Sequence, residues 1–454
     1  MKRHVLFHHM LAKLSLYGLF ASTASLANPL ADYVHATNRH IAWTVISQRQ
    51  QSWGTLTRLS ITTQRWRGHD WKHQLVIVRP TVLSHPETAF LLVAGDGDGG
   101  NHIEQLRTLA ERGGTLAAVL TNVPNQPLYD GRKEDALIAF SFNQYLQTGD
   151  ESWPLLFPMV ESVSSAMDIL QLFTYRPGEP MLENFVVGGA SKRGWATWLT
   201  AAVDDRVKAI APMVIDVLNM KPQLQWSEQI YGHQSVKIRD YTELNLHRRH
   251  DSPAMQKLRS WVDPYEYRHL LTMPKLLLLG TNDPYWTVDS LRHYWHQLPG
   301  PKLLYQTPNA GHNLNGGDQA LQTLAAFYEM VVHDEPLPKL SWRFDYNGER
   351  QVKLQLASSH KTTAAQLWIS HSDSRDFRPA SWHSETVSLT ASADRVATEL
   401  AAPANGYKAF LLEVELQTRQ GNLYKLSTEA RVAPDTEPCY CWRGDDVQAS
   451  KPNP

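Results

Sequence analysis

Residues 184–195, which read NFVVGGASKRGW, constrain the fold of this chain more than any other stretch. A β-branched and aromatic run leads into two glycines and an alanine, reaches Ser191, and continues into a helix-forming segment. This order predicts a strand, a sharp turn and a helix, with small residues where the two backbones approach each other. Such a turn lifts the serine hydroxyl above the edge of a sheet and directs the N–H groups of the helix N-terminus toward a bound group. Ser191 is therefore a candidate nucleophile.

This turn departs from the common G-x-S-x-G pattern. Arg193 occupies the fifth position, and the second glycine comes one residue later, as Gly194. An ordinary strand-to-helix turn, in which Ser191 only caps the helix, explains the stretch almost as well. Residues further along the chain have to decide between the two interpretations.

Strands and helices alternate through the middle of the chain. Continuous apolar runs predict strands that are covered on both faces; they lie at residues 89–93, 116–120, 185–187, 209–214, 275–279 and 303–305. Helical patterns follow at 103–112, 159–173, 192–203, 288–297 and 319–332. Alternating runs at 57–62 and 75–78 predict antiparallel strands that enter the same sheet. The expected fold class is α/β, a mostly parallel sheet with helices on both faces.

Two long segments interrupt this alternation, at residues 122–158 and 216–271, and both are rich in aromatic and polar residues. We interpret them as cap or lid insertions that form substrate walls, within a first domain that spans 28–335. Residues 336–433 instead alternate apolar and polar positions between regular turns, which predicts an immunoglobulin-like β-sandwich. The predicted flexible tail is 434–454.

The N-terminal residues 1–27 read as a signal peptide. Lys2 and Arg3 supply positive charge, a short apolar stretch follows, and a small-x-small cleavage site ends at Ala27. No later stretch reaches the roughly 18 apolar residues of a transmembrane helix. The sequence therefore predicts a soluble exported protein, periplasmic or secreted.

The charges of the chain nearly cancel, with 44 Lys and Arg against 45 Asp and Glu, so a nucleic-acid partner is not expected. The two cysteines, Cys439 and Cys441, are separated by one residue, and a disulfide between them would be strained. Two thiols alone also make a poor metal site. Neither cysteine receives a catalytic role, and whether they form a disulfide stays open.

An activated serine needs a base and a group that orients the base, and in this fold class the chain order is Ser, then Asp or Glu, then His. Asp283 follows the strand at 275–279, and His312 lies in a glycine-containing loop after the next strand. A histidine in this position could take the serine proton and return it to the leaving group. Asp216, which follows the strand at 209–214, is the alternative acid. The expected triad is Ser191, Asp283 and His312.

The expected oxyanion hole combines the backbone N–H of Lys192 with one from the glycine-rich loop that contains Gly95, Asp96 and Gly97. The acidic residues of this loop resemble part of a calcium site, but the glycine and distant glutamate of a full calcium loop do not align. We therefore expect no metal and no organic cofactor.

Four motifs occur together in this chain: GGASKRGW at 188–195, VIDVLNM at 214–220, GTNDPYW at 280–286 and NAGHNL at 309–314. Together they resemble the PhoPQ-activated pathogenicity-related protein family. The resemblance implies an α/β-hydrolase fold, export from a Gram-negative bacterium and a link to virulence or envelope stress. The family's serine, aspartate and histidine correspond to Ser191, Asp283 and His312. The chain is also similar to secreted autocrine proliferation repressors, which implies that a signalling role can exist on this scaffold.

Two functional hypotheses follow. The first is an exported serine hydrolase that cleaves an ester or amide of a small molecule or peptide, with an esterase slightly favoured over a peptidase. The second is a non-catalytic secreted binding or signalling protein that keeps the hydrolase architecture, because fold alone does not decide function.

Overall fold

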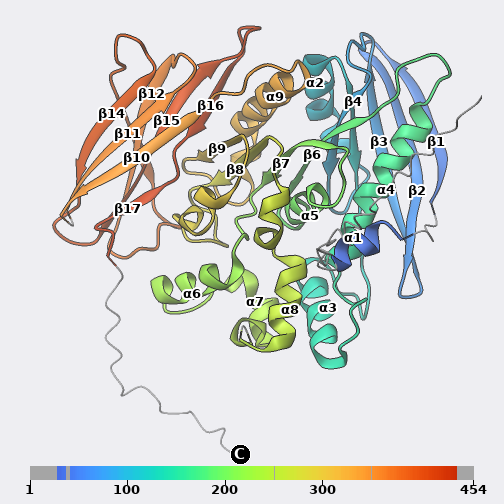
Figure 1. The fold of residues 1–454 in the computed structure, drawn as a ribbon, viewed down its shortest axis with the longest axis horizontal. Coiled ribbons are helices and arrows are strands. Elements are labelled where there is room, and N and C mark those ends of the chain that lie inside the picture. The colour runs from blue at the N-terminus through green and yellow to red at the C-terminus, as the bar shows by residue number, and fades with distance from the viewer. Residues whose placement is uncertain (1–27, 37–40, 250, 349, 437–454) are drawn as a thin grey trace, which may run out of the picture.

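The computed structural model describes residues 28–36, 41–249, 251–348 and 350–436 (Figure 1). The predicted signal peptide at 1–27 and both cysteines lie outside these ranges. No described helix is both long and apolar enough to cross a membrane.

A nine-stranded sheet forms the centre of the molecule, in the order β1-β2-β3-β5-β4-β6-β7-β8-β9. Its strands are β1 (Ala42–Gln51), β2 (Gly54–Trp66), β3 (His69–Pro80), β4 (Thr88–Val93), β5 (Leu116–Leu120), β6 (Asn184–Ala190), β7 (Val207–Met213), β8 (Lys275–Gly280) and β9 (Lys302–Thr307). The first three strands are antiparallel and β3 pairs antiparallel with β5. All pairs from β5 to β9 are parallel, so these strands end at one edge of the sheet.

Helices cover both faces of this sheet (Figure 1). One face carries α2 (Ile103–Gly113) and α9 (Asp318–Val332), and the other carries α1 (Pro29–Val34), α4 (Leu156–Thr174) and α5 (Lys192–Ala201). Side chains along β4 show why: Phe90 and Leu92 pack toward α2 and α9, whereas Leu91 packs into the core on the α4 side. Period-two alternation of apolar residues therefore supplies two cores, one on each face.

The two insertions are largely helical and lie together at the lower part of the molecule in Figure 1. The first contains α3 (Glu134–Thr148). The second contains α6 (Met220–Tyr231), α7 (Arg239–Glu243) and α8 (Pro253–Val262), with 3₁₀ turns at Val236–Ile238 and Leu246–Arg248 between them and a third at Pro264–Leu270 after α8. We refer to residues 216–271 as the cap.

Two antiparallel sheets follow the central domain, as expected for a sandwich. The first orders its strands β10-β11-β14, and the second orders them β13-β12-β15-β16, with β17 paired to β15. Their bounds are β10 (Leu340–Asn347), β11 (Gln351–Ser358), β12 (Ala364–Ser372), β13 (Trp382–Thr386), β14 (Arg395–Ala401), β15 (Tyr407–Gln417), β16 (Leu423–Ser427) and β17 (Arg431–Ala433). The expected fold class, α/β-hydrolase with cap insertions and a C-terminal antiparallel sandwich, is confirmed.

Several local predictions were wrong. The segment 288–297 forms two 3₁₀ turns, Ser290–His293 and Trp295–Gln297, rather than one helix. The alternating runs that predict the sandwich do not include β14, and the run at residues 423–432, expected to form one strand, divides into β16 and β17. The start of the predicted tail is held by Arg375, which donates to the carbonyls of Pro434 and Thr436.

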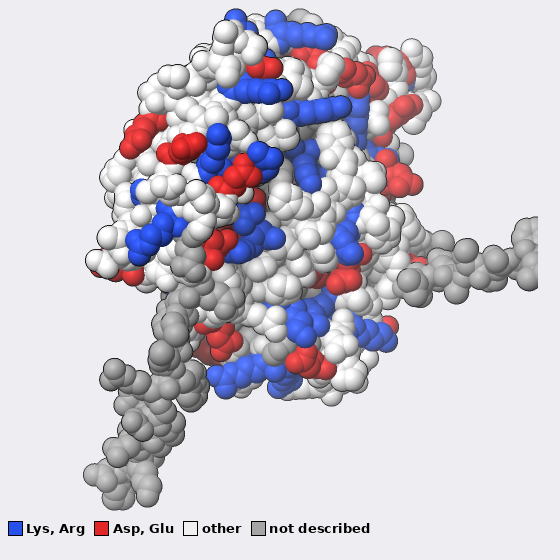
Figure 2. Space-filling model, turned by 60° about the vertical axis from the view of Figure 1, so that its left-hand side comes forward, with Lys and Arg blue, Asp and Glu red and all other residues white. Residues whose placement is uncertain are grey.

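The sandwich and the central domain share one apolar core. Phe327 on α9 belongs to the same buried cluster as Leu354 and Phe410 of the sandwich. Figure 2 shows Lys, Arg, Asp and Glu interspersed over one face of the molecule, with uncharged areas between them.

Candidate active site

Ser191 lies at the turn between β6 and α5, at the edge where the parallel strands end. Its backbone has φ 57° and ψ −126°, in a region that residues with a side chain rarely adopt. Its N–H donates to the carbonyl of Met213, and its carbonyl accepts from Trp195, so hydrogen bonds on both sides hold the strained turn. The hydroxyl makes no capping hydrogen bond to the helix. The capping interpretation of Ser191 is therefore wrong.

Glycine is required at two positions of this turn. A Cβ at Gly189 would lie 2.7 Å from the carbonyl carbon and oxygen of Arg193. A Cβ at Gly194 would lie 2.6 Å from Ile215 Cγ2 and 2.7 Å from the Gly189 carbonyl oxygen. Gly194 therefore serves the close approach of strand and helix.

The side chains of Ser191, His312 and Asp283 form a continuous hydrogen-bonded chain. His312 Nε2 lies 2.9 Å from Ser191 Oγ, and His312 Nδ1 lies 2.8 Å from Asp283 Oδ2. Because a carboxylate only accepts hydrogen bonds, Nδ1 carries the proton and Nε2 is left to accept from the serine hydroxyl. Loops after β8 and β9 position the acid and the histidine. This is the arrangement in which a histidine can remove the serine proton.

Tyr285 contacts both Asp283 and His312. Its backbone N–H donates to the second oxygen of Asp283 at 3.0 Å. Its ring lies against the imidazole of His312, with centroids 4.4 Å apart and planes tilted by 32°. Asp283 is buried, whereas His312 keeps contact with solvent. The carboxylate is therefore fixed, and the imidazole is held by contacts on its edge and its face.

Asp216, the alternative acid, does not form this contact; the oxygen beside His312 Nδ1 belongs to Asp283. Asp216 is buried after β7 and lines a small cavity together with Asp283. Burial raises the pKa of Asp216 to about 7, and the neighbouring Asp283 carboxylate adds to the effect. The geometry favours Asp283 as the orienting acid.

The glycine-rich loop follows β4 and lies beside the turn at Ser191. The carbonyl of Gly95 accepts from Asn122 N–H at 2.8 Å, and Gly97 N–H donates to the Asn122 side chain at 3.3 Å. Because the N–H of Gly97 is already used, Gly95 and Asp96 are the better candidates to pair with Lys192 as oxyanion donors. The Asp96 carboxylate accepts from Lys133 and Gln126, each at 2.9 Å, which fastens the loop to the first insertion.

Arg193, which replaces the usual glycine of the turn, lies beneath this loop. A Cβ on Gly95 would lie 2.6 Å from Arg193 Nη2, so the guanidinium touches the loop backbone. Both terminal nitrogens donate to the carboxylate oxygens of Glu134 at 2.6 Å, and Nε donates to the carbonyl of Val123. Burial alone would raise the pKa of Glu134, but the Arg193 guanidinium outweighs it and holds that pKa below its usual range. Sequence reasoning left the role of Arg193 open and missed Glu134.

Lys192 makes a second link from the turn to the insertions. Its ammonium lies 2.6 Å from the Asp135 carboxylate, and Tyr241 of α7 donates to the same carboxylate at 3.0 Å. This cluster joins the turn, the first insertion and the cap. The charge of Lys192 is therefore paired within the protein.

Two asparagines connect the loops that carry Asp283 and His312 to the sandwich by hydrogen bonds. Asn282, next to Asp283, donates to the carbonyls of Phe377, Arg378 and Ala380 at 2.6 to 3.2 Å. Asn309, three residues before His312, exchanges two hydrogen bonds with the backbone of Trp382, at 2.7 and 2.9 Å. The motifs that supplied Asp283 and His312 also contain these asparagines, but their partners could not be read from the sequence.

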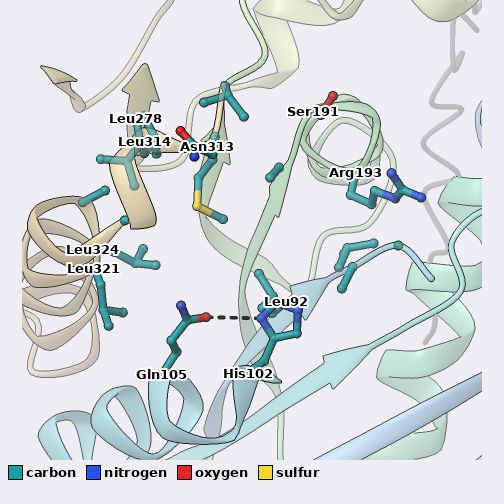
Figure 3. A pocket seen from close by; sticks show the side chains of 18 of the residues that line it. Leu92, His102, Gln105, Ser191, Arg193, Leu278, Asn313, Leu314, Leu321 and Leu324 are labelled. Carbon is teal, nitrogen blue, oxygen red and sulfur yellow. Dashed lines mark hydrogen bonds between the residues drawn. The ribbon is translucent and has the colours of Figure 1, made fainter. Parts of the chain in front are cut away.

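Two cavities meet at Ser191 and His312. The larger has a volume of about 410 Å³ and lies between the sheet edge, α2 and α9 (Figure 3). The smaller, about 150 Å³, lies beneath the cap. Within the described ranges, no group of three or more His, Cys, Asp and Glu side chains could hold a metal ion.

Comparison with known proteins identifies relatives along most of the chain. A family model described as PhoPQ-activated pathogenicity-related protein matches residues 30–378. "Autocrine proliferation repressor protein A" of Dictyostelium discoideum is 29% identical over 471 residues, which cover 94% of this chain and 95% of that protein.

Solved structures that resemble the chain are more distant in sequence. An acetyl xylan esterase from Paenibacillus sp. R4 is 12% identical with a TM-score of 0.47, covering 65% of this chain and 91% of that one. Acetyl xylan esterase 1 from Thermoanaerobacterium sp. is 16% identical with a TM-score of 0.46, covering 66% and 92%. An S-formylglutathione hydrolase from Agrobacterium tumefaciens is 13% identical with a TM-score of 0.43, covering 64% and 99%.

Proposed function

The chain belongs to the PhoPQ-activated pathogenicity-related protein family, and we propose that it is an exported serine hydrolase that cleaves an ester or amide bond. The observation that carries this proposal is the hydrogen-bonded chain from Ser191 through His312 to Asp283. The strained backbone of Ser191 supports it, because strain of this kind persists where the surroundings enforce it and clusters at active sites.

In the proposed mechanism, His312 Nε2 takes the proton of Ser191 as its Oγ attacks the substrate carbonyl. Asp283 holds the imidazole in the correct tautomer and stabilises the imidazolium. The N–H of Lys192, with that of Gly95 or Asp96, receives the negative charge that develops on the carbonyl oxygen. His312 then gives the proton to the leaving group, whose departure leaves the acyl group on Ser191 Oγ. In the second half, His312 takes a proton from water, which attacks the acyl carbonyl, and returns this proton to Ser191 Oγ as the carboxylic acid leaves.

An esterase fits the site better than a peptidase. The charges nearest to Ser191 are paired within the protein: Lys192 with Asp135, and Arg193 with Glu134. A site for a peptide terminus needs a charge that is available to the substrate. An uncharged ester is therefore the favoured substrate class, and turnover of a panel of acyl and aminoacyl reporter compounds tests this preference.

The competing function is a secreted binding or signalling protein. The observation in its favour is that the Dictyostelium relative is named a proliferation repressor. A pure binder has no need for a serine, a histidine and an aspartate in proton-transfer geometry. We therefore place the hydrolase first.

Labelling with a fluorophosphonate probe separates the two functions. We expect covalent labelling of the wild-type protein and none of Ser191→Ala, because the probe reacts with an activated serine. Absence of labelling of the folded wild-type protein between pH 6 and 9 would contradict the hydrolase.

A pair of substitutions tests the assignment of the acid. Asp283→Asn should lower turnover by about 10⁴-fold, as in serine proteases, because it disturbs the tautomer of the base. Asp216→Asn should cost much less. A larger loss in Asp216→Asn than in Asp283→Asn would refute the assignment.

Export is proposed from residues 1–27, and fractionation of cells that produce the chain with and without this segment tests it. Recovery of the full chain only in the cytoplasm would contradict export.

A further inference from the structure

The larger cavity at the active site has apolar walls. Leucines and valines from the sheet edge, α2 and α9 line it, and they include Leu92, Leu106, Leu109, Val214, Leu321 and Leu324. In Figure 3, Ser191 lies at the rim, and His102 and Gln105 lie across the cavity from it. His102 Nδ1 and Gln105 Oε1 are 3.2 Å apart and form a hydrogen bond with each other. The cavity therefore offers a long apolar surface that starts at the nucleophile.

Charge in this cavity is neutralised by the protein itself. Arg193 lines it, but its guanidinium is bound by the Glu134 carboxylate and the Val123 carbonyl. An anionic or cationic arm of a substrate would lose its hydration here without gaining a free partner. The cavity is therefore suited to an uncharged hydrocarbon chain.

The cavity beneath the cap is smaller and also mainly apolar. Its walls include Trp195, Leu224, Met255 and Leu258. Both cavities contact Ser191 and His312, so one bound ester could place its reacting carbonyl at the serine and one arm in each cavity. The cavity between α2 and α9 has the larger volume, about 410 against 150 Å³, so we assign the longer arm of the ester to it.

We propose that the substrate is an ester with a long, linear, uncharged hydrocarbon arm, and that the cavity between α2 and α9 binds this arm. The inference rests on the proposed function, since it names the substrate class of the same site. A water molecule takes up about 30 Å³ of the liquid, and a methylene group is of similar size, so the cavity accommodates a chain on the order of ten carbons. Each methylene buried there should raise kcat/KM about fourfold until the cavity is full.

Two ester series test the proposal. One is 4-nitrophenyl esters with acyl chains of increasing length, and the other is acetate esters of alcohols of increasing length. We expect kcat/KM to rise steeply with length in at least one series and then to level off. A flat profile in both series would overturn the proposal.

Two matched leucines supply the variants, because each is only half-buried and each lines one of the cavities. Leu321→Trp reduces the volume of the larger cavity and should remove most of the gain in kcat/KM from longer chains. Leu224→Trp reduces the volume of the cap cavity and should leave the dependence on chain length unchanged. An unaltered length profile in Leu321→Trp would contradict the assignment of the cavity.

A binding measurement separates this proposal from the catalytic one. Ser191→Ala cannot form the acyl-enzyme, so calorimetry can follow the binding of uncleaved methyl decanoate to it. We expect binding that Leu321→Trp, introduced into the same background, weakens at least tenfold. Such binding without fluorophosphonate labelling of the wild type would refute the proposed hydrolase activity and support the cavity as the binding site of the hydrocarbon arm. Labelling without such binding would refute only the proposed role of the cavity.

Discussion

Replacing Glu134 by glutamine removes the carboxylate that holds Arg193 under the glycine-rich loop. The native pair has two contacts of 2.6 Å, and the guanidinium touches the backbone at Gly95. Glutamine keeps one acceptor and presents an NH₂ group to a cation that is almost fully buried. We expect the guanidinium to move and the loop at Gly95 and Asp96 to lose its position.

The size of the effect follows from these contacts. A hydrogen bond to a charged group contributes about 1.5–3 kcal/mol, and Glu134 is 38% exposed, so the free energy of unfolding should fall by about 1.5 kcal/mol, the lower value. A misplacement of about 1 Å in an active site can cost about 10²-fold in rate, similar to the loss of one oxyanion donor. We therefore expect kcat to fall by about 10²-fold, with KM changed only a few-fold.

Hydrolysis of a 4-nitrophenyl ester gives kcat and KM, and urea unfolding gives the stability. Asp204→Asn is the matched control, since Asp204 binds Arg206 through both oxygens, at 2.8 and 2.9 Å, beyond the C-terminal end of α5, whereas the loop contacts Arg193 at its N-terminal end. The control should lose at least as much stability, because the Asp204 side chain is only 6% exposed, and it should keep its kcat. If Glu134→Gln loses stability but keeps kcat within threefold of the wild type, the pair has no role in positioning the loop.

Three further predictions concern other parts of the site. Asn309→Ala removes two hydrogen bonds to Trp382 and should lower the free energy of unfolding by about 2 kcal/mol and kcat about tenfold, measured by urea unfolding and ester hydrolysis; an unchanged kcat would show that His312 needs no support from the sandwich. Burial raises the pKa of Asp216 to about 7, so the folded state binds this proton more tightly than the unfolded state; the resulting stability is fully present below about pH 4 and is lost as the pH rises through 7. Asp216→Asn should therefore flatten the decline of stability between about pH 4 and 7 in urea unfolding, and an unchanged decline would contradict the raised pKa of Asp216. Gly194→Ala should slow fluorophosphonate labelling at least 10²-fold, because its Cβ would lie 2.6 Å from Ile215 and force the turn to shift; wild-type labelling would refute the argument from close approach.

The sequence was most informative where local patterns determine position. Continuous apolar runs predict parallel strands, and the residue that follows each run must lie at one edge of the sheet. Ser191, Asp283 and His312 each follow such a run, so their convergence could be predicted without any long-range information. The choice of Asp283 over Asp216 depended on loop geometry, which the sequence left open.

Other features depended on contacts between distant residues and could not be predicted. Arg193 departed from the usual glycine pattern, but its partner Glu134 is 59 residues away. Strand β14 has exposed residues at most positions, which obscured its pairing with β11. The residues at 288–297 carry a helical pattern, yet Asp289 is engaged by Arg375 of the sandwich and Trp226 of the cap, and the backbone there forms 3₁₀ turns.

The contacts around the site also indicate where it can open. The loops that carry Asp283 and His312 are bound to a sandwich that shares a continuous apolar core with α9, so these loops should move little. The cap is packed less tightly near α7, because only two side chains among residues 232–249 are buried, those of Ser235 and Leu246. This segment is tied to the site by exchangeable polar contacts, which include the Tyr241 hydroxyl on the Asp135 carboxylate that pairs with Lys192 and the Ser235 hydroxyl on the Pro284 carbonyl. Local opening requires the least free energy where few apolar contacts are lost, so substrate should enter and product leave on the α7 side.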